Sequence, residues 1–433
     1  MGKMKLTMIL MLSLLLLAGF STAYASGKTE GTSAKETGTI TFGASQNWIK
    51  DVDRDIAADF EKETGIKIDY QVNPDDQYTN IIKTKLNTGE APDIFMWAAG
   101  LELRQLPLDK VLDLSSEPWV GRLKDWAKKS GMVDGKLLGL NTWSIDGWGM
   151  VYNTAIFDKY SLTPPKNYPD FLKVCDTLLK NGIIPVYEIP IDLWHTELFM
   201  DEIAADANLH SPGLYEKLNS NKAKFADVKE FEQSLTAIKE MADKGYFGPT
   251  YMSDKWTNAT EALGTGKYAM FLGYTSWQVE CAKDYPQSGA ENWKMFPSPL
   301  GATGDVKSFG TSAGGVLQLV YKGSKNVNLV KKWLAYKTQV PVLNKFYAGR
   351  ADLGNPSFPE VTKAPTAGLA SMTDFVKGNF LSDGATGILF WDQMGFGSLI
   401  QGMLAGQMTP KQVLEAIDTN RAKVAKAAGT PGF

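Results

Sequence analysis

Residues 85–97 read Lys-Leu-Asn-Thr-Gly-Glu-Ala-Pro-Asp-Ile-Phe-Met-Trp, and this stretch predicts a helix end, a turn and a buried strand. Gly89 supplies a C-terminal stop, and Pro92 cannot continue the helix. The strand covers Ile94–Trp97 and ends on a large aromatic residue, where ligands collect in open α/β sheets. The apolar residues before the turn recur at the spacing of one helix face: Tyr78, Ile81, Ile82 and Leu86.

The residues upstream predict a strand, a helix and a second strand at Thr39–Ala44, Asp51–Thr64 and Ile66–Val72. A strand–helix–strand unit implies a parallel sheet, so the fold class is α/β. Later strands are expected at Lys267–Gly273 and Val316–Tyr321. A long helical stretch is expected at Ala223–Lys244.

The composition is that of an ordinary globular protein with room for two domains. The chain has 433 residues, of which 44% are hydrophobic and 21% charged, with a net charge of −3. Because the basic residues form no long run and no helical stripe, nucleic acid is not expected as a partner.

The N-terminus predicts a secretory signal peptide over residues 1–25. Lys3 and Lys5 form the basic region, Leu6–Phe20 is apolar, and Ala23-Tyr24-Ala25 matches a cleavage site. Residues 26–38 are expected to form a flexible leader. No cysteine for lipid attachment lies near the cleavage site, so we expect an exported product without a lipid anchor.

The chain has two cysteines, Cys175 and Cys281, each in a predicted helix. Whether they pair is left open by the sequence. Their spacing and the two histidines, His195 and His210, give zinc little to bind, so neither a metal nor a cofactor is expected.

Several of the twelve tryptophans fall in loops or at the ends of predicted strands. Any single one is more often packing than ligand. A pyranose ring, however, has an apolar face that stacks on indole and a rim of hydroxyl groups that needs polar partners. The set therefore favours an aromatic sugar-binding cleft; its members are Trp48, Trp97, Trp143, Trp194, Trp277 and Trp391.

Several short motifs, in the same order, resemble those of the extracellular solute-binding proteins of ABC importers. The resemblance is to their carbohydrate-binding group, which includes maltose-binding protein. The motifs are LNTGEAPDIFMW at 86–97, FEKETGIKI at 60–68, KYAMFLG at 267–273 and GMLAGQMTPKQVLEAIDTNRAK at 402–423. The segment 136–153 also resembles the family, although Asn141 stands where the family usually has proline.

The resemblance implies two α/β lobes around a ligand cleft, with several crossings at a hinge. Residues 39–140 and 306–352 would form the N-terminal lobe. Residues 141–305 and 353–433 would form the C-terminal lobe.

It also implies ligand-binding positions in both lobes. The stacking candidates are Trp48, Trp97, Trp194, Tyr274, Trp277 and Trp391, and Trp143 adds a further aromatic residue in the crossing segment. The hydrogen-bonding candidates are Gln46, Asn47, Glu188, His195 and Asp392.

The implied function is binding without chemistry. A monomeric protein in the periplasm would capture a sugar, close around it and deliver it to a membrane permease. Two alternatives stay open. A binder of a non-sugar solute such as a polyol phosphate would use Arg104, Arg350 or Arg421. A secreted carbohydrate-active enzyme would use a carboxylate pair drawn from Glu188, Asp192, Glu197 and Asp201.

Overall fold

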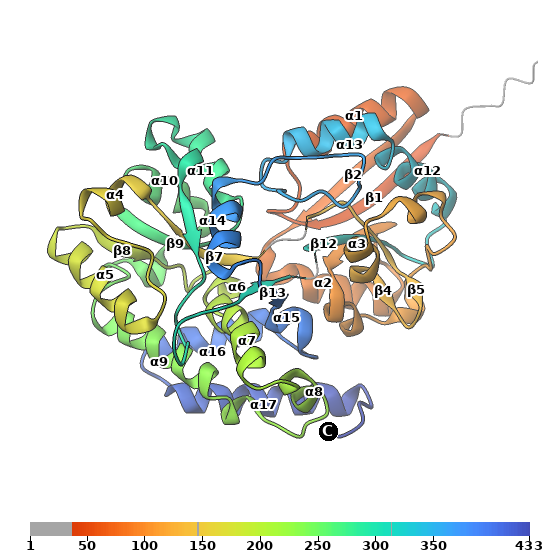
Figure 1. Ribbon diagram of the computed structural model, residues 1–433. Coiled ribbons are helices and arrows are strands. Elements are labelled where there is room, and N and C mark those ends of the chain that lie inside the picture. Colours follow the sequence, from red (N-terminus) through yellow and green to blue (C-terminus); the bar gives the residue numbers. More distant parts are fainter. Residues whose placement is uncertain (1–36, 145–146, 313) are drawn as a thin grey trace, which may run out of the picture. The chain divides into compact units, whose positions relative to one another are not determined.

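The computed structural model describes residues 37–144, 147–312 and 314–433. The predicted signal peptide and most of the predicted leader therefore lie outside the described residues. The chain builds two main β-sheets, each flanked by helices (Figure 1). We call the five-stranded sheet the first sheet and the four-stranded sheet the second sheet.

The first sheet has the strand order β2-β1-β3-β12-β6. Strand β1 pairs in parallel with both β2 and β3, as the strand–helix–strand pattern predicts. Strand β12 then inserts antiparallel between β3 and β6, although it lies far downstream in the chain. The strands are β1 (Gly38–Ser45), β2 (Ile66–Asn73), β3 (Ile94–Ala98), β6 (Gly139–Asn141) and β12 (Val316–Val320).

The central strands of the first sheet are buried on both faces. In β3, Ile94 and Met96 pack into one hydrophobic core with α1, α12 and α13, whereas Phe95 and Trp97 pack into another with α2. Because successive side chains of a strand point to opposite faces, a strand buried on both sides is apolar throughout. The helices around this sheet are α1 (Asp51–Thr64), α2 (Asp75–Thr88), α3 (Asp125–Ser130), α12 (Val327–Lys337) and α13 (Val340–Gly349).

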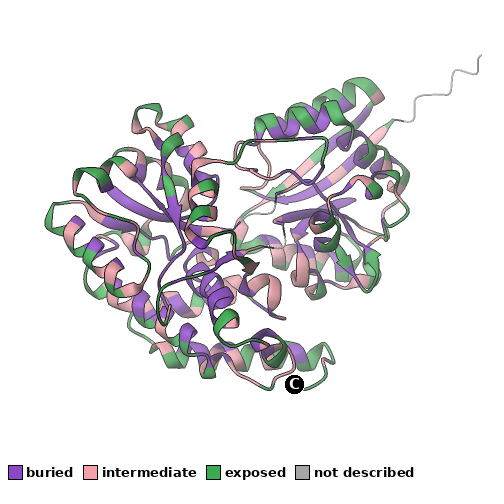
Figure 2. Ribbon diagram, in the orientation of Figure 1, coloured by how far each residue is buried: buried purple, intermediate pink, exposed green. Residues whose placement is uncertain are grey.

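The second sheet has the strand order β10-β7-β9-β8, and β9 pairs antiparallel with β7 and parallel with β8. It is also covered on both faces, so its strands are buried (Figure 2). The strands are β7 (Trp148–Tyr152), β8 (Ile184–Tyr187), β9 (Tyr268–Tyr274) and β10 (Lys294–Phe296).

Two groups of helices cover the second sheet, again according to the alternation along its strands. Met270 and Leu272 of β9 share a core with α5, α7, α9, α16 and α17, whereas Phe271 shares a core with α10, α11 and α14. The bounds are α4 (Thr154–Lys159), α5 (Tyr168–Lys180), α6 (Leu193–Thr196), α7 (Leu198–His210), α8 (Leu214–Asn219), α9 (Lys229–Asp243), α10 (Ala259–Gly264), α11 (Trp277–Asp284), α14 (Ala367–Val376), α15 (Gly384–Gly387), α16 (Gln393–Leu404) and α17 (Pro410–Ala427).

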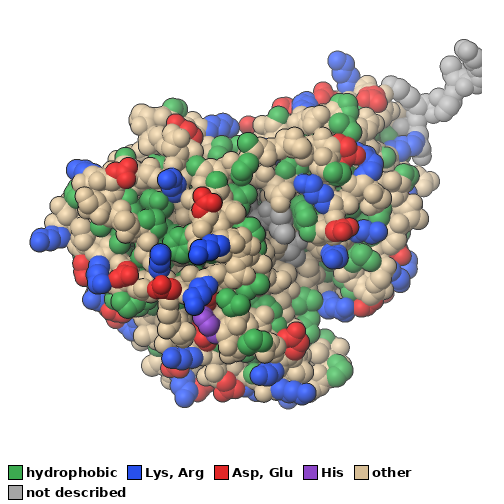
Figure 3. Space-filling model, viewed as in Figure 1, with side chains coloured by type: hydrophobic (Ala, Val, Ile, Leu, Met, Phe, Trp, Pro, Cys, Tyr) green, Lys and Arg blue, Asp and Glu red, His purple; other side chains and the backbone are tan. Residues whose placement is uncertain are grey.

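Two small sheets complete the strands. Strand β11 (Phe309–Thr311) pairs in parallel with β13 (Phe380–Ser382), and β4 (Met132–Val133) pairs with β5 (Lys136–Leu137). Among the described ranges, no helix has the length and apolar character needed to cross a membrane. Basic and acidic side chains are interspersed on the face shown in Figure 3.

Most predicted elements are confirmed. Helix α1 has the predicted bounds, and Gly89 ends α2 in the left-handed region at φ +80°. The prediction of one helix over Ala223–Lys244 is wrong at its start, because a 3-10 turn at Phe225–Asp227 precedes α9. Cys175 and Cys281 are buried in α5 and α11, in different cores, and both are free thiols.

Candidate functional site

Four partly exposed aromatic side chains pack together at one end of the second sheet, and we call them the aromatic cluster. The ring centroids of Trp148 and Tyr274 are 5.6 Å apart, and those of Trp148 and Trp194 are 5.7 Å apart. Trp256 closes the group at 5.1 Å from Trp194, and it lies over Tyr274 at 5.9 Å with an interplanar angle of 29°. The cluster therefore presents a continuous, incompletely buried aromatic surface.

The position of each ring follows from the local fold. Trp148 and Tyr274 are direct partners in the β7–β9 pairing, so their side chains lie on the same face of the sheet. Trp194 belongs to the short helix α6. Trp256 lies in a 3-10 turn (Trp256–Asn258), where its backbone N–H donates to Oδ2 of Asp192 at 2.6 Å.

Directly behind the cluster lies a buried polar pair, His195 and Glu188. Nδ1 of His195 is 3.2 Å from Oε1 of Glu188, and Nε2 is 2.8 Å from the carbonyl oxygen of Leu272. The Thr196 hydroxyl donates to the same Oε1 at 2.8 Å. The imidazole stacks on Phe271 with a centroid distance of 5.2 Å and an angle of 9°.

A polar loop follows strand β1 of the first sheet. Ser45 and Asn47 both donate hydrogen bonds to the carboxylate of Asp75, in the first turn of α2. The partly exposed ring of Trp48 packs edge-on against Tyr78 at 5.2 Å. The loop is therefore held in place by α2 at the carboxyl end of a parallel strand.

An aspartate beside the polar loop, Asp75, and an aspartate beside the aromatic cluster, Asp192, interact electrostatically. Burial raises the pKa of Asp192, the hydrogen bond from Trp256 lowers it, and the charge of Asp75 contributes to raising it. Asp75 is thus near enough to Asp192 to interact with it. Gln46 has an exposed side chain and is anchored by its backbone N–H, which donates to the carbonyl of Asn73 at 2.9 Å.

Trp143 lies beneath a buried arginine. The Arg350 guanidinium carbon is 4.4 Å from the Trp143 ring centroid, which is cation–π geometry. Arg350 also binds Asp352 through Nε at 2.8 Å and Nη2 at 2.6 Å, and it donates to the carbonyl of Trp48 at 3.5 Å. Arg350 therefore contacts both Trp48 and Trp143.

Arg350 therefore lies against one of the aromatic candidates, Trp143. Its charge is nevertheless engaged, because Asp352 holds it in two places and Asp53 lies 3.6 Å from Nη1. A cavity of about 10 Å³ beside Trp48 and Trp143 holds at most one water molecule, so it is not a solute site.

Three of the predicted stacking residues are instead core residues. Trp97, Trp277 and Trp391 are each 1% exposed. The indole N–H of Trp97 donates to the carbonyl of Glu102 at 3.0 Å, and that of Trp391 donates to Oε2 of Glu197 at 2.7 Å. Trp277 packs against Phe271 at 4.8 Å. Because these three side chains are almost completely buried, they offer almost no surface to a ligand.

The family model for bacterial extracellular solute-binding proteins matches residues 46–339, which is more than half of the chain. The chain belongs to this family. Its members are receptors that bind solutes rather than enzymes that transform them.

Two curated relatives share part of their length with it. An uncharacterised ABC transporter extracellular-binding protein of Pyrococcus horikoshii is 26% identical over 274 residues, covering 57% of this chain and 62% of the relative. A melibiose/raffinose/stachyose-binding protein of Bacillus subtilis is 27% identical over 277 residues, covering 62% and 63%. The aligned part thus spans less than two thirds of either relative.

Solved structures share the fold. A Bacillus licheniformis sugar transporter protein in complex with stachyose superposes with a TM-score of 0.75 at 21% identity, covering 89% of this chain and 100% of that one. A raffinose complex of a solute-binding protein gives 0.70 at 17% identity, covering 88% and 99%. The predicted α/β fold of two-lobed periplasmic binding proteins is confirmed.

Two of the predicted hydrogen-bonding residues are completely buried, and a third caps a helix. Glu188 and His195 are each 0% exposed, because they pair with each other beneath the aromatic cluster. Asp392 is exposed, but its Oδ1 caps α16 by accepting from the N–H of Gly395 at 3.1 Å.

Three buried carboxylates lie below β11 and α15. Oxygens of Asp201, Glu202 and Asp383 come within 4.8 Å of one another. Burial raises the pKa of each of them, and the charge of Asp383 reinforces the shift at Asp201 and Glu202. Each accepts a backbone N–H, from Ala385, Trp148 and Thr386 respectively, at 2.6–3.0 Å. These three carboxylates therefore hold backbone segments of the fold in place.

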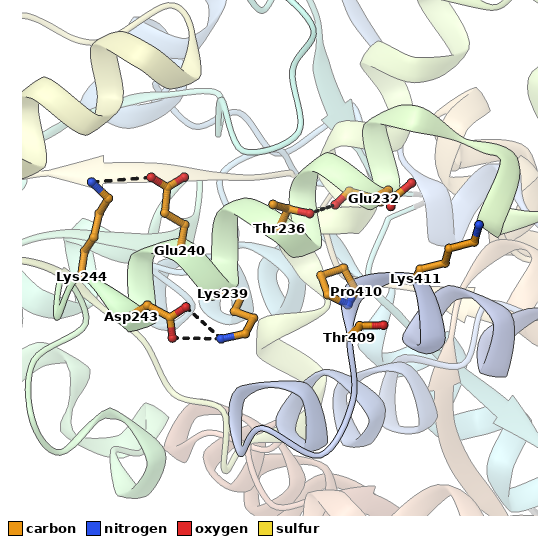
Figure 4. Close-up of a pocket in the computed structure, with 9 residues that line it drawn as sticks. All are labelled: Glu232, Thr236, Lys239, Glu240, Asp243, Lys244, Thr409, Pro410 and Lys411. Atoms are coloured by element: carbon orange, nitrogen blue, oxygen red, sulfur yellow. Dashed lines mark hydrogen bonds and ion pairs between the residues drawn. The ribbon is translucent and has the colours of Figure 1, made fainter.

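A groove of about 530 Å³ lies elsewhere, between α9 and the start of α17 (Figure 4). Its charged side chains pair along α9, with Lys239 at 2.8 Å from Asp243 and Lys244 at 3.6 Å from Glu240. None of the predicted site residues lines this groove, and no aromatic ring does. The groove therefore differs in chemistry from the aromatic cluster.

The structure thus brings Trp194 and Tyr274 together and adds two residues that the sequence reasoning missed, Trp148 and Trp256. Trp148 could have been found, since it begins a strand opposite the end of another. Trp256 lies in an irregular turn with no periodic signal, so only the folded contact with Asp192 reveals it.

Proposed function

We propose that this solute-binding protein captures a mono- or oligosaccharide on the aromatic cluster and delivers it to the permease of an ABC importer. The observation that carries the proposal is the grouping of four partly exposed aromatic rings, Trp148, Trp194, Trp256 and Tyr274. Large aromatic side chains gathered at a surface mark a binding site. Indole faces suit the apolar C–H face of a pyranose.

Polar groups beside the cluster supply the complementary chemistry. The partly exposed carboxylate of Asp192 borders the cluster, and the charge of Asp75, which accepts a hydrogen bond from Asn47 of the polar loop, acts on Asp192. Carboxylate and amide groups can accept and donate hydrogen bonds to sugar hydroxyls in defined directions. The combination of stacking faces and a polar rim is what a neutral sugar requires.

The relatives support the same solute class. One is named for melibiose, raffinose and stachyose, and two structural neighbours hold stachyose and raffinose. Oligosaccharides that contain galactose are therefore the first solutes to test. We also propose that the chain is exported with cleavage near Ala25, and that the mature protein works as a monomer in the periplasm.

We further propose that the two lobes close on the sugar. The lobes would comprise residues 39–140 with 306–352, and residues 141–305 with 353–433. Contacts between these two sets support closure: Nζ of Lys50 lies 3.8 Å from Oε1 of Glu280, and the Ser276 hydroxyl donates to the carbonyl of Asp352. A solute that contacts both sets would stabilise the closed arrangement.

A phosphorylated solute is not favoured. Arg350 is held by Asp352, and Arg104 binds Asp134 at 2.8 Å. Arg421 is buried and donates to the carbonyl of Leu389 at 3.0 Å. None of these guanidinium groups lies in the aromatic cluster.

The proposal is tested by isothermal titration calorimetry of the mature protein with raffinose, stachyose, galactose and a chitin oligosaccharide. We expect saturable binding of at least one sugar, a change in tryptophan fluorescence on binding, and loss of binding in Trp256→Ala. Trp119→Phe, in the core of the first sheet, is the matched control. Binding of inorganic or sugar phosphates but of no neutral sugar would contradict it.

A further inference from the structure

The aromatic cluster is supported from behind by a histidine that the proposed binding mechanism does not use. His195 is completely buried, and its ring centroid lies 5.5 Å from that of Trp194, 6.1 Å from Trp256 and 6.5 Å from Trp148. It therefore contacts three of the four rings of the cluster.

Hydrogen-bond accounting determines where the protons of His195 lie. Nε2 faces the carbonyl oxygen of Leu272 at 2.8 Å, and a carbonyl can only accept, so Nε2 carries a hydrogen. Nδ1 faces Oε1 of Glu188 at 3.2 Å. If both of these atoms were deprotonated, two lone pairs would oppose each other in a buried site, so a proton lies between them.

The surroundings favour that proton on the imidazole. Oε1 of Glu188 also accepts a hydrogen bond from Thr196, which stabilises negative charge on that oxygen, whereas the buried Oε2 has no partner among the described residues. The imidazole stacks on Phe271, and aromatic faces attract a cation. Other ionisable groups near the pair are Asp192 and, around Asp192, Lys255 and Asp75.

We propose that His195 is a positioning residue, a buried imidazolium paired with Glu188 that fixes the orientation of Trp148, Trp194 and Trp256 for sugar binding. The role in sugar binding rests on the proposed function. The state of the ion pair does not, because it is a property of the protein without solute. Bonds at both ring nitrogens prevent the imidazole from flipping or sliding, so the rings packed against its edge are held as well.

The first test needs no solute. Nitrogen-15 labelling of histidine gives signals from His195 and His210 only, and His210→Gln assigns them. At neutral pH we expect both ring nitrogens of His195 to carry a hydrogen. A lone-pair nitrogen at Nδ1 of His195 would overturn the ion pair.

The second test measures how the tryptophan rings of the cluster are packed. Near-ultraviolet circular dichroism reports the asymmetric packing of the tryptophans, and we expect His195→Gln to lose part of this signal while the far-ultraviolet spectrum stays unchanged. In the same variant, affinity for raffinose or stachyose, whichever binds the wild type, should fall by about tenfold or more. His210→Gln is the matched control, and it should keep both signal and affinity.

Two variants of Glu188 test the positioning role independently of His195→Gln. Glu188→Gln retains a hydrogen-bonding partner of the same shape, so it should restore most of the ring signal relative to Glu188→Ala. If His195→Gln does not fold, the comparison of these two Glu188 variants takes its place. Equal ring signals in all variants would overturn the positioning role. Failure of the wild type to bind any sugar would instead contradict the proposed function and leave the spectroscopic result to decide on His195.

Discussion

Trp148 and Tyr274 are paired across two antiparallel strands, and their rings meet edge to face at 5.6 Å with an interplanar angle of 88°. This pair brings the first residue of β7 and the last residue of β9 to the same end of the second sheet. Trp194 and Trp256 then pack onto it from separate turns. Four aromatic rings from four separate segments are thus gathered at one end of the second sheet.

Removal of one ring from the aromatic cluster should reduce solute affinity more than stability. We expect Trp256→Ala to lower affinity for a bound sugar by about ten- to a hundredfold, because stacking area is lost at a site that is only partly buried. Calorimetry gives the affinity and thermal unfolding the stability. An unchanged affinity would place the sugar elsewhere.

The carboxylate of Asp75 should organise the polar loop. Asp75→Ala removes the acceptor for Ser45 and Asn47, so the loop loses two hydrogen bonds. We expect about 1–3 kcal/mol lower stability in urea unfolding, together with weaker sugar binding. Asp76→Ala, the exposed neighbour on α2, is the control. A variant as stable and as tightly binding as the control would contradict this role.

Gly315 should tolerate no side chain. Its φ is +68°, and a Cβ atom there would lie 1.9 Å from Cδ1 of Trp143. Gly315→Ala is therefore expected to displace Trp143 and to destabilise the protein by about 1–3 kcal/mol. Gly304→Ala, which meets open space, should be neutral in the same thermal unfolding experiment. Equal melting temperatures for the two variants would refute the close contact.

Arg350→Lys should be strongly destabilising although it keeps the charge. Lysine cannot bind Asp352 through two nitrogens and stack on Trp143 at the same time. Breaking a buried pair costs about 3–5 kcal/mol, which urea unfolding would detect. Arg104→Lys alters an exposed pair and should change stability by less than about 1 kcal/mol. Similar losses in both variants would argue against a special role for Arg350.

Stability should also depend on pH through Glu102, in the turn after β3. Burial raises the pKa of Glu102 to about 7 from its ordinary value of 4.5, with Lys83 opposing the shift and Asp392 reinforcing it. The folded state thus binds more protons than the unfolded state between these two values. Its contribution to stability is present below pH 4.5 and is lost as pH rises through 7.

The matching measurement is urea unfolding at the two ends of this range. Between about pH 5 and about pH 8, the free energy of unfolding should fall less in Glu102→Gln than in the wild type. We expect the two decreases to differ by about 1 kcal/mol. Parallel pH profiles for the two proteins would show that Glu102 does not hold the extra proton.

The sequence predicted the elements better than the site. Helix α1 was predictable from its apolar spacing and from Gly65, which ends it in the left-handed region at φ 79°. Trp97 was not, because β3 is buried on both faces and an unbroken apolar strand does not reveal which face meets a ligand. Trp256 depends on Asp192, 64 residues away, and no local pattern encodes that contact.

The position of β12 has a consequence for how the chain acquires its structure. This strand fills the place between β3 and β6, so the first sheet has a gap until a segment far downstream arrives. Contacts between distant segments slow the search for the native state, because a long loop must close before the contacts can form. We therefore expect the first sheet to stay incomplete, and residues 38–141 to stay open to proteases, until residues 316–320 join them.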